Sequence, residues 1–105
     1  MQVWIDFPYP DPESRFAIWK NMFPSQAPLD TSTVDFNFLA KQFQITGGVI
    51  KNVAVSSAFL AKEFGADKIM MVHIIRSLKR EFDKMGKPGL KAEFGKYYSI
   101  ISNEN

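Results

Sequence analysis

Apolar residues recur every three or four positions along most of this 105-residue chain, which is the period of an amphipathic helix. The longest such run follows Thr46, whose hydroxyl can accept a hydrogen bond from a first-turn amide, and it reaches Phe64. Gly65 then offers a residue suited to the left-handed conformation that often ends a helix. The run predicts a helix that buries a stripe of small and apolar side chains, namely Ile50, Val53, Ala54, Ser57, Ala58 and Ala61.

Three further helices are predicted by the same spacing together with capping residues. Asp11, followed by a proline, begins one that ends near Phe23, because the residue before the next proline is disfavoured in helical conformation. Asp35 begins a short second helix, and a fourth runs from about residue 71 to residue 85, where Gly86 stops it. The inward positions of that last helix are expected to be Met71, Ile75, Leu78, Phe82 and Met85.

The two ends of the chain differ in pattern from its middle. Residues 3–7 form a short β-prone run that ends at Pro8, and an isolated strand of that length needs a partner sheet. Residues 87–105 contain large apolar side chains, which predicts a short terminal helix docked on the bundle or on a neighbour. The expected fold is all-α, a small four-helix bundle with a short N-terminal strand segment and an extra C-terminal helix. Its expected divisions are a strand and linker at 1–10, a helical domain at 11–86 and a tail at 87–105.

The composition narrows the class of protein. Hydrophobic residues make up 46% and charged residues 23% of the chain, which fits one globular domain. The net charge of +2 argues against a dedicated nucleic-acid binder, because such domains usually carry a concentrated basic patch. The absence of cysteine excludes disulfides and thiolate metal sites. No apolar run approaches the roughly 20 residues needed to span a bilayer and no signal peptide is recognisable, so we expect a cytoplasmic protein without a membrane partner.

Residues that could support catalysis are few. His73, the single histidine, lies near the start of the last helix among apolar residues, where packing or capping is the expected role, because a metal site needs several convergent ligands. No nucleophile–histidine–acid set can be assembled, and the phosphate-binding loop of P-loop ATPases is absent. Glu81 and Asp83 are interspersed with basic residues, as on a solvated helix face. We therefore expect the chain by itself to be catalytically inactive.

The glycine pair at the start of the longest helix is the main candidate for a binding site. Gly47 and Gly48 each increase the entropic cost of ordering, yet they let a ligand approach backbone amides at the positive end of the helix dipole. Lys51 lies in the first turn, where a cation opposes the dipole, so it is a candidate contact for an anion. A tight turn between helices is the structural alternative.

Taken in order, the motifs resemble the C-terminal lid of an AAA+ ATPase of bacterial type. The resemblance covers nearly the whole chain. Residues 7–15 are similar to the end of the last core strand running into the first lid helix, and residues 46–52 (Thr-Gly-Gly-Val-Ile-Lys-Asn) to the step that opens the third lid helix. Further similar segments are residues 16–20, 34–40, 58–61, 73–76 and 93–98.

The resemblance implies a function for the parent chain. The parent would hydrolyse ATP to remodel a macromolecular substrate, with Mg held by a core domain that this sequence lacks. Gly47 and Gly48 would lie against adenine and ribose, and Ile18 and Met22 would flank the base. Expected partners are the lid's own core domain and neighbouring subunits of a homo-oligomeric, hexameric ring, whereas the isolated chain is expected to be monomeric.

One departure from the family pattern concerns the phosphate contact. Many AAA+ proteins place a sensor arginine at the start of the third lid helix, where this chain has Gly48 and Val49. Lys51 lies about half a turn further on and is a weak substitute. Val49 also replaces the usual aspartate of this step.

Two other classes of function stay open. The chain could be a free-standing helical adaptor that binds proteins through its aromatic residues. It could also be a helix-turn-helix module built from the second and third helices, although only Lys51 and Asn52 lie near the start of the third helix to read bases.

Overall fold

The computed structural model describes residues 10–23, 28–87 and 91–102, and those ranges are predominantly helical. They contain no strand, only an isolated parallel bridge between Leu29 and Ile69. The predicted all-α class is confirmed, while the predicted strand at 3–7 lies outside the described residues. In chain order the elements are α1 (Pro12–Met22), α2 (Phe36–Gln42), α3 (Gly47–Glu63), α4 (Met71–Lys84), α5 (Lys91–Phe94), the 3₁₀ turn η2 (Gly95–Tyr97) and α6 (Tyr98–Ser102).

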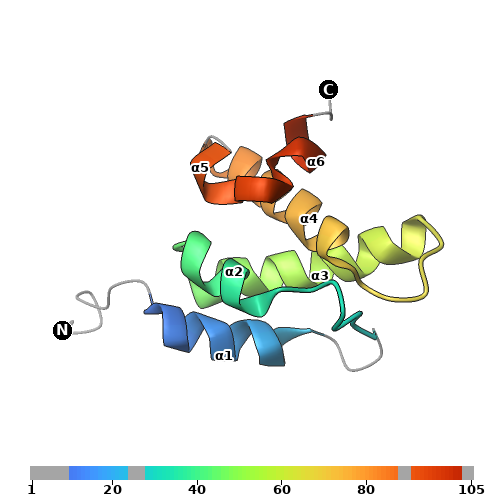
Figure 1. Cartoon of the computed structure of the whole chain (residues 1–105), viewed down its shortest axis with the longest axis horizontal. Helices are drawn as coiled ribbons and strands as arrows, with labels where there is room; N and C mark the ends of the chain where they lie inside the picture. The colour runs from blue at the N-terminus through green and yellow to red at the C-terminus, as the bar shows by residue number, and fades with distance from the viewer. Residues whose placement is uncertain (1–9, 24–27, 88–90, 103–105) are drawn as a thin grey trace.

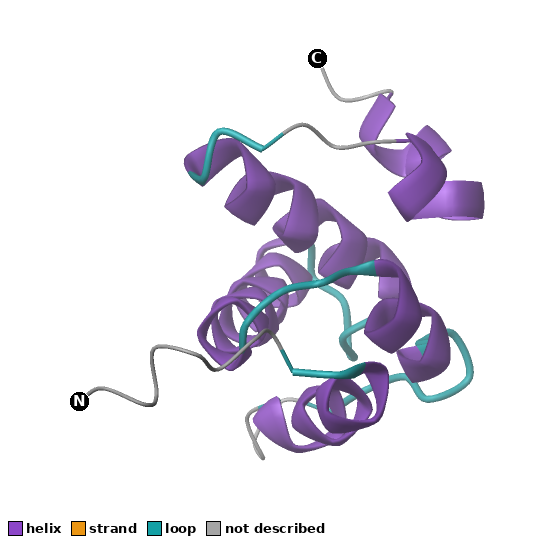
Figure 2. Ribbon diagram, turned by 90° about the vertical axis from the view of Figure 1, so that its left-hand side faces the viewer, coloured by secondary structure: helices purple, strands orange, loops and turns teal. Residues whose placement is uncertain are grey.

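The long helix α3 lies at the centre of the arrangement (Figure 1). α1 runs alongside it in the same direction, and α2 packs against α1. α4 returns along α3 in the opposite direction, and α5, η2 and α6 lie beyond α4 (Figures 1 and 2). α3 is therefore held between α1 on one side and α4 on the other.

The helix boundaries follow from the local chemistry of the sequence. The Ser14 amide donates to Oδ1 of Asp11 (2.8 Å), and the Phe38 amide donates to Oδ1 of Asp35 (3.0 Å). Gly65 and Gly86, which follow α3 and α4, have φ values of 71° and 70°, where a residue with a Cβ is strained. The starts of α1 and α2 and the ends of α3 and α4 were all predicted from these residues, and the structure confirms them.

Three aromatic rings dock the C-terminal tail on the bundle. Phe43, Phe82 and Phe94 are each fully buried, and their ring centroids are 5.0 to 5.9 Å apart in edge-to-face arrangements. Such pairs contribute about 0.5–1.5 kcal/mol each beyond the area they bury. Ile101 of α6 is buried as well. The predicted docked helix in the tail is thus confirmed as a short, broken helical segment.

Three burial predictions were wrong. Met85 is 49% exposed, because α4 ends at Lys84 and the chain then turns away through Gly86. Ala58 is only half-buried, because it lies at the edge of the α3 stripe, where it still packs against the core. Glu81 is buried rather than solvated, because it lies in the apolar stripe of α4, three residues after Leu78.

The two longer connections support each other. The Ile69 amide donates to the Pro28 carbonyl (2.8 Å), and the Asp30 amide donates to the Ile69 carbonyl (2.9 Å). The Met71 amide, at the start of α4, donates to Oγ1 of Thr33 (3.4 Å). Through these two bonds Ile69 ties the α1–α2 connection to the α3–α4 connection.

Candidate functional site

The glycine pair forms the first turn of α3, as expected. Oγ1 of Thr46 accepts the Val49 amide (3.3 Å), and the Thr46 carbonyl accepts the Ile50 amide (3.0 Å). Within the described residues, the amides of Gly47 and Gly48 have no hydrogen-bond partner. The first amides of a helix point out along its axis at the positive end of the dipole, so these two are open to an external acceptor.

Neither glycine is required by the fold around it. Gly65, Gly86 and Gly95 have positive φ values, whereas Gly47 and Gly48 do not. A Cβ on Gly48 would meet nothing closer than Oγ1 of Thr46 at 3.8 Å. Alanine would therefore fit at position 48 without strain and would raise helix propensity. Glycine at this position is explained neither by backbone conformation nor by packing within the described residues.

An apolar wall from α1 borders the glycine pair. A Cβ on Gly47 would lie 3.8 Å from Cδ1 of Ile18, so the structure brings these two predicted site residues together. Ile18 and Met22 are half-buried, and four residues separate them, which places them on one side of α1. α1 and α3 run in the same direction (Figure 1), and both Ile18 and Met22 pack against the core.

Lys51 extends the site along α3. It is exposed, and it has no ion-pair partner within the described residues. It follows Gly47 by four residues and Gly48 by three, so its side chain leaves the helix on the glycine side. A cation here is placed to meet an anion that also contacts the free amides.

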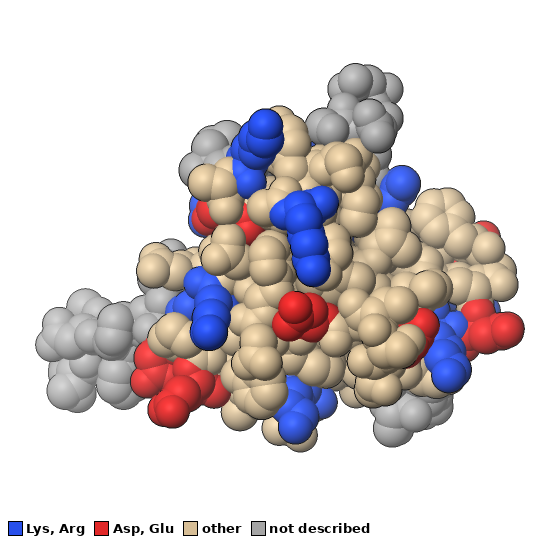
Figure 3. Space-filling model, viewed as in Figure 1, with Lys and Arg blue, Asp and Glu red and all other residues tan. Residues whose placement is uncertain are grey.

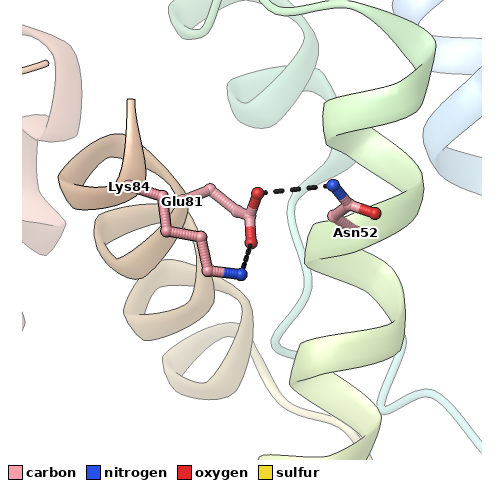
Figure 4. A network of polar contacts seen from close by, with 3 residues as sticks. All are labelled: Asn52, Glu81 and Lys84. Atoms are coloured by element: carbon pink, nitrogen blue, oxygen red, sulfur yellow. Dashed lines mark hydrogen bonds and ion pairs between the residues drawn. The ribbon is translucent and has the colours of Figure 1, made fainter. Parts of the chain in front are cut away.

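A polar network holds the start of α3 against the end of α4. Figure 4 shows Glu81 of α4 between Asn52 of α3 and Lys84. Nδ2 of Asn52 donates to Oε1 of Glu81 (3.5 Å), and Nζ of Lys84 donates to Oε2 (3.0 Å). The Glu81 side chain is only 6% exposed, so the carboxylate is buried with both oxygens partnered. Sequence reasoning missed it, although Glu81 lies at an inward position of the α4 stripe.

A buried arginine fixes the start of α1. Arg15 is 3% exposed; its Nε donates to the Ala40 carbonyl of α2 (2.7 Å), and its Nη1 donates to the Pro10 carbonyl. Two carbonyls at such different places in the sequence are thereby held by one planar guanidinium. The sequence pattern gave no signal for this, because Arg15 follows four exposed residues, 11–14, at the start of α1.

His73 has the capping role expected for it. Its Nδ1 accepts the Met70 amide at the start of α4 (2.9 Å). Burial lowers the pKa of His73 below its ordinary value, and the nearby Arg76 charge lowers it further. No cluster of three or more potential metal-ligating side chains occurs within the ranges that the structure describes.

Comparisons of the chain with protein-family models, with curated proteins and with solved structures found no match.

The surface of the molecule adds two observations. Figure 3 shows basic and acidic side chains interspersed over one face of the molecule. In addition, none of the helices in the described ranges is long and apolar enough to cross a bilayer.

Proposed function

We propose that the chain is the helical lid of an AAA+ ATPase, and that the start of α3 binds the adenine and ribose of ATP. The observation that carries the proposal is the glycine pair. Gly47 and Gly48 present free amides at a helix start, and no strain or close packing within the described residues requires glycine there. Removing β-carbons at this point lets a flat ring approach the backbone.

The neighbouring side chains suit the same ligand. Ile18 and Met22 form an adaptable apolar wall on which one face of a base can lie. Lys51 supplies a cation on the glycine side of α3, within the same region as the free amides. The phosphate loop and Mg would come from the core domain of the parent, which this chain lacks, so the chain contributes to ATP binding but not to the hydrolytic step.

The proposed mechanism is a movement of the lid as one body. A nucleotide can shift a lid only if it binds one position more tightly than the other. The contacts at Gly47, Gly48 and Ile18 would supply the difference in nucleotide affinity between the ATP-bound and ADP-bound positions of the lid. In a hexameric ring, the moving lid would press on the core of the neighbouring subunit and transmit work to the macromolecular substrate.

A titration followed by amide and methyl NMR tests the proposal on the chain itself. With ADP added to millimolar concentration, we expect selective shifts at the Gly47 and Gly48 amides and at the Ile18 and Met22 methyl groups. The Gly48→Leu variant should lose these shifts, while its folded spectrum is retained because position 48 is open. Equal shifts throughout α4, or unchanged binding by Gly48→Leu, would refute the adenine contact.

One observation favours the adaptor as a second candidate. Phe59 is 68% exposed and Phe64 is 61% exposed, which is unusual for large aromatic side chains. An adaptor would bind its partner through these rings and would show no response at Gly48 to nucleotide. The same titration therefore separates the two functions.

A further inference from the structure

The outer face of α3 carries an unpartnered ridge of four residues. Lys51, Val55, Phe59 and Glu63 follow one another at intervals of four, which aligns them along the helix surface. All four are exposed, Val55 by 39% and Phe59 by 68%. Within the described residues, neither Lys51 nor Glu63 has an ion-pair partner.

The ridge is self-complementary when two copies of α3 lie antiparallel. When a second copy of α3 is laid antiparallel about a two-fold axis at the level of residue 57, Lys51 of each copy faces Glu63 of the other. Val55 of each copy then faces Phe59 of the other. An isologous contact requires this kind of self-complementarity, in which residue i meets residue j and j meets i. A cation at one end, an anion at the other and two apolar residues between them satisfy that requirement.

We infer that two copies of this chain pair through the α3 ridge, with Phe59 as the central anchor. An open groove of about 450 Å³ lies beside the ridge and is lined by Val55, Ala58, Phe59 and Ile69, among others. The Phe59 ring of the second copy has an apolar surface there on which to lie. Interdigitation of two i±4 ridges sets the helices at a crossing angle of about −50°.

The pairing is weak and depends on concentration. One helix pair buries less area than the roughly 1,200 Å² of total surface typical of stable interfaces. The dimer therefore accumulates only at high protein concentration. Under that condition the oligomeric state differs from the monomer expected from the sequence. Lys51 is shared with the proposed nucleotide site, whereas Val55, Phe59 and Glu63 lie beyond the first turn of α3 and belong to the ridge alone.

Charge reversal tests the antiparallel register directly, by sedimentation velocity over a wide range of protein concentration. Lys51→Glu brings two pairs of carboxylates together, and Glu63→Lys brings two pairs of ammonium groups together. Each variant alone should therefore self-associate up to about tenfold more weakly than the unmodified chain. Mixed with each other, the two variants regain both opposite-charge pairs. We expect the mixture, and the double variant, to associate as tightly as the unmodified chain.

Aromatic substitutions provide the matched control. Phe59→Ala should weaken association at least tenfold, whereas Phe64→Ala removes a similarly exposed ring outside the ridge and should leave association unchanged. The inference is overturned if the unmodified chain stays monomeric at millimolar concentration, or if the mixed charge variants associate no better than either alone. Because Glu63→Lys leaves the glycine pair untouched, its nucleotide titration should remain normal, so failure of one proposal is distinguishable from failure of the other.

Discussion

Replacing Gly48 with alanine should stabilise the fold and weaken nucleotide binding at the same time. The stabilising part follows from the structure of the folded chain. Gly48 is in the first turn of α3 without a positive φ, and a Cβ there meets only Oγ1 of Thr46, at 3.8 Å. The substitution therefore reduces the entropy of the unfolded chain without introducing strain into the folded one.

The expected gain is modest but measurable. Substitutions of this kind at compatible positions stabilise proteins by about 0.4–1 kcal/mol. For a domain of this size that corresponds to a rise of about 2–8 °C in melting temperature. In urea, with a slope of about 1–3 kcal/mol/M, the midpoint should rise by about 0.1–1 M. The added methyl group occupies the space into which a base would come, so ADP affinity should fall at least tenfold, equivalent to about 1.4 kcal/mol.

Gly65→Ala is the matched control for the stability arm. Gly65 has a φ of 71° at the end of α3, and nothing lies near its missing Cβ, so the change tests backbone strain alone. We expect it to destabilise by about 1 kcal/mol, because the strain of the left-handed conformation exceeds the entropic gain. If Gly48→Ala destabilises the chain as Gly65→Ala does, the claim that the fold does not need glycine at position 48 is refuted. If Gly48→Ala binds ADP unchanged, the nucleotide contact is refuted instead.

Three further predictions concern groups that hold the bundle together. Arg15→Lys should cost about 1.5–3 kcal/mol in urea unfolding, because an ammonium group cannot replace both carbonyl contacts of the guanidinium; a loss below 0.5 kcal/mol would contradict this. Phe94→Ala should cost about 3–5 kcal/mol and expose the tail to limited proteolysis, whereas unchanged protection would show that other contacts dock it. The pKa of His73 is lowered from 6.5 in the folded state, so its contribution to the free energy of unfolding should be full above pH 6.5 and should fall as the pH drops from 6.5 towards the lower folded pKa. His73→Gln should remove this loss of stability. Urea midpoints at pH 7.5 and 5.5 measure it.

The elements of the fold were predictable because their signals are local. Asp11, Asp35 and Thr46 each accept a hydrogen bond from a first-turn amide, which depends only on residues within three positions. Gly65 and Gly86 end their helices through their own φ values. The nearness of Ile18 to Gly47 agrees with the family resemblance, which places both residues against the same base, whereas helical periodicity alone gives no relation between α1 and α3.

The groups that were missed depend on contacts between distant parts of the chain. Glu81 looked solvated because its sequence neighbours are basic, but its environment is set by Asn52, 29 residues away on α3. Arg15 is buried because the Ala40 carbonyl lies 25 residues further along the chain yet next to it in space. Met85 was placed inside by extending the helical period one residue past the point where α4 ends. Periodicity reports which face of a helix is apolar, but it does not report what a polar group on that face meets.

These distant contacts have a consequence for how the proposed lid would move. Arg15 joins the Pro10 carbonyl to α2, and the Asn52–Glu81 hydrogen bond joins the first turns of α3 to the end of α4. Arg15 therefore ties α1 to α2, and the Asn52–Glu81 bond ties α3 to α4, while α1 itself packs against α3. A nucleotide that contacts the apolar wall on α1 and the glycine pair on α3 meets one rigid surface, so its preference acts on the position of the whole helical body rather than on the packing within it. Loosening that body through Glu81→Ala should then weaken nucleotide binding even though Glu81 touches no part of the site.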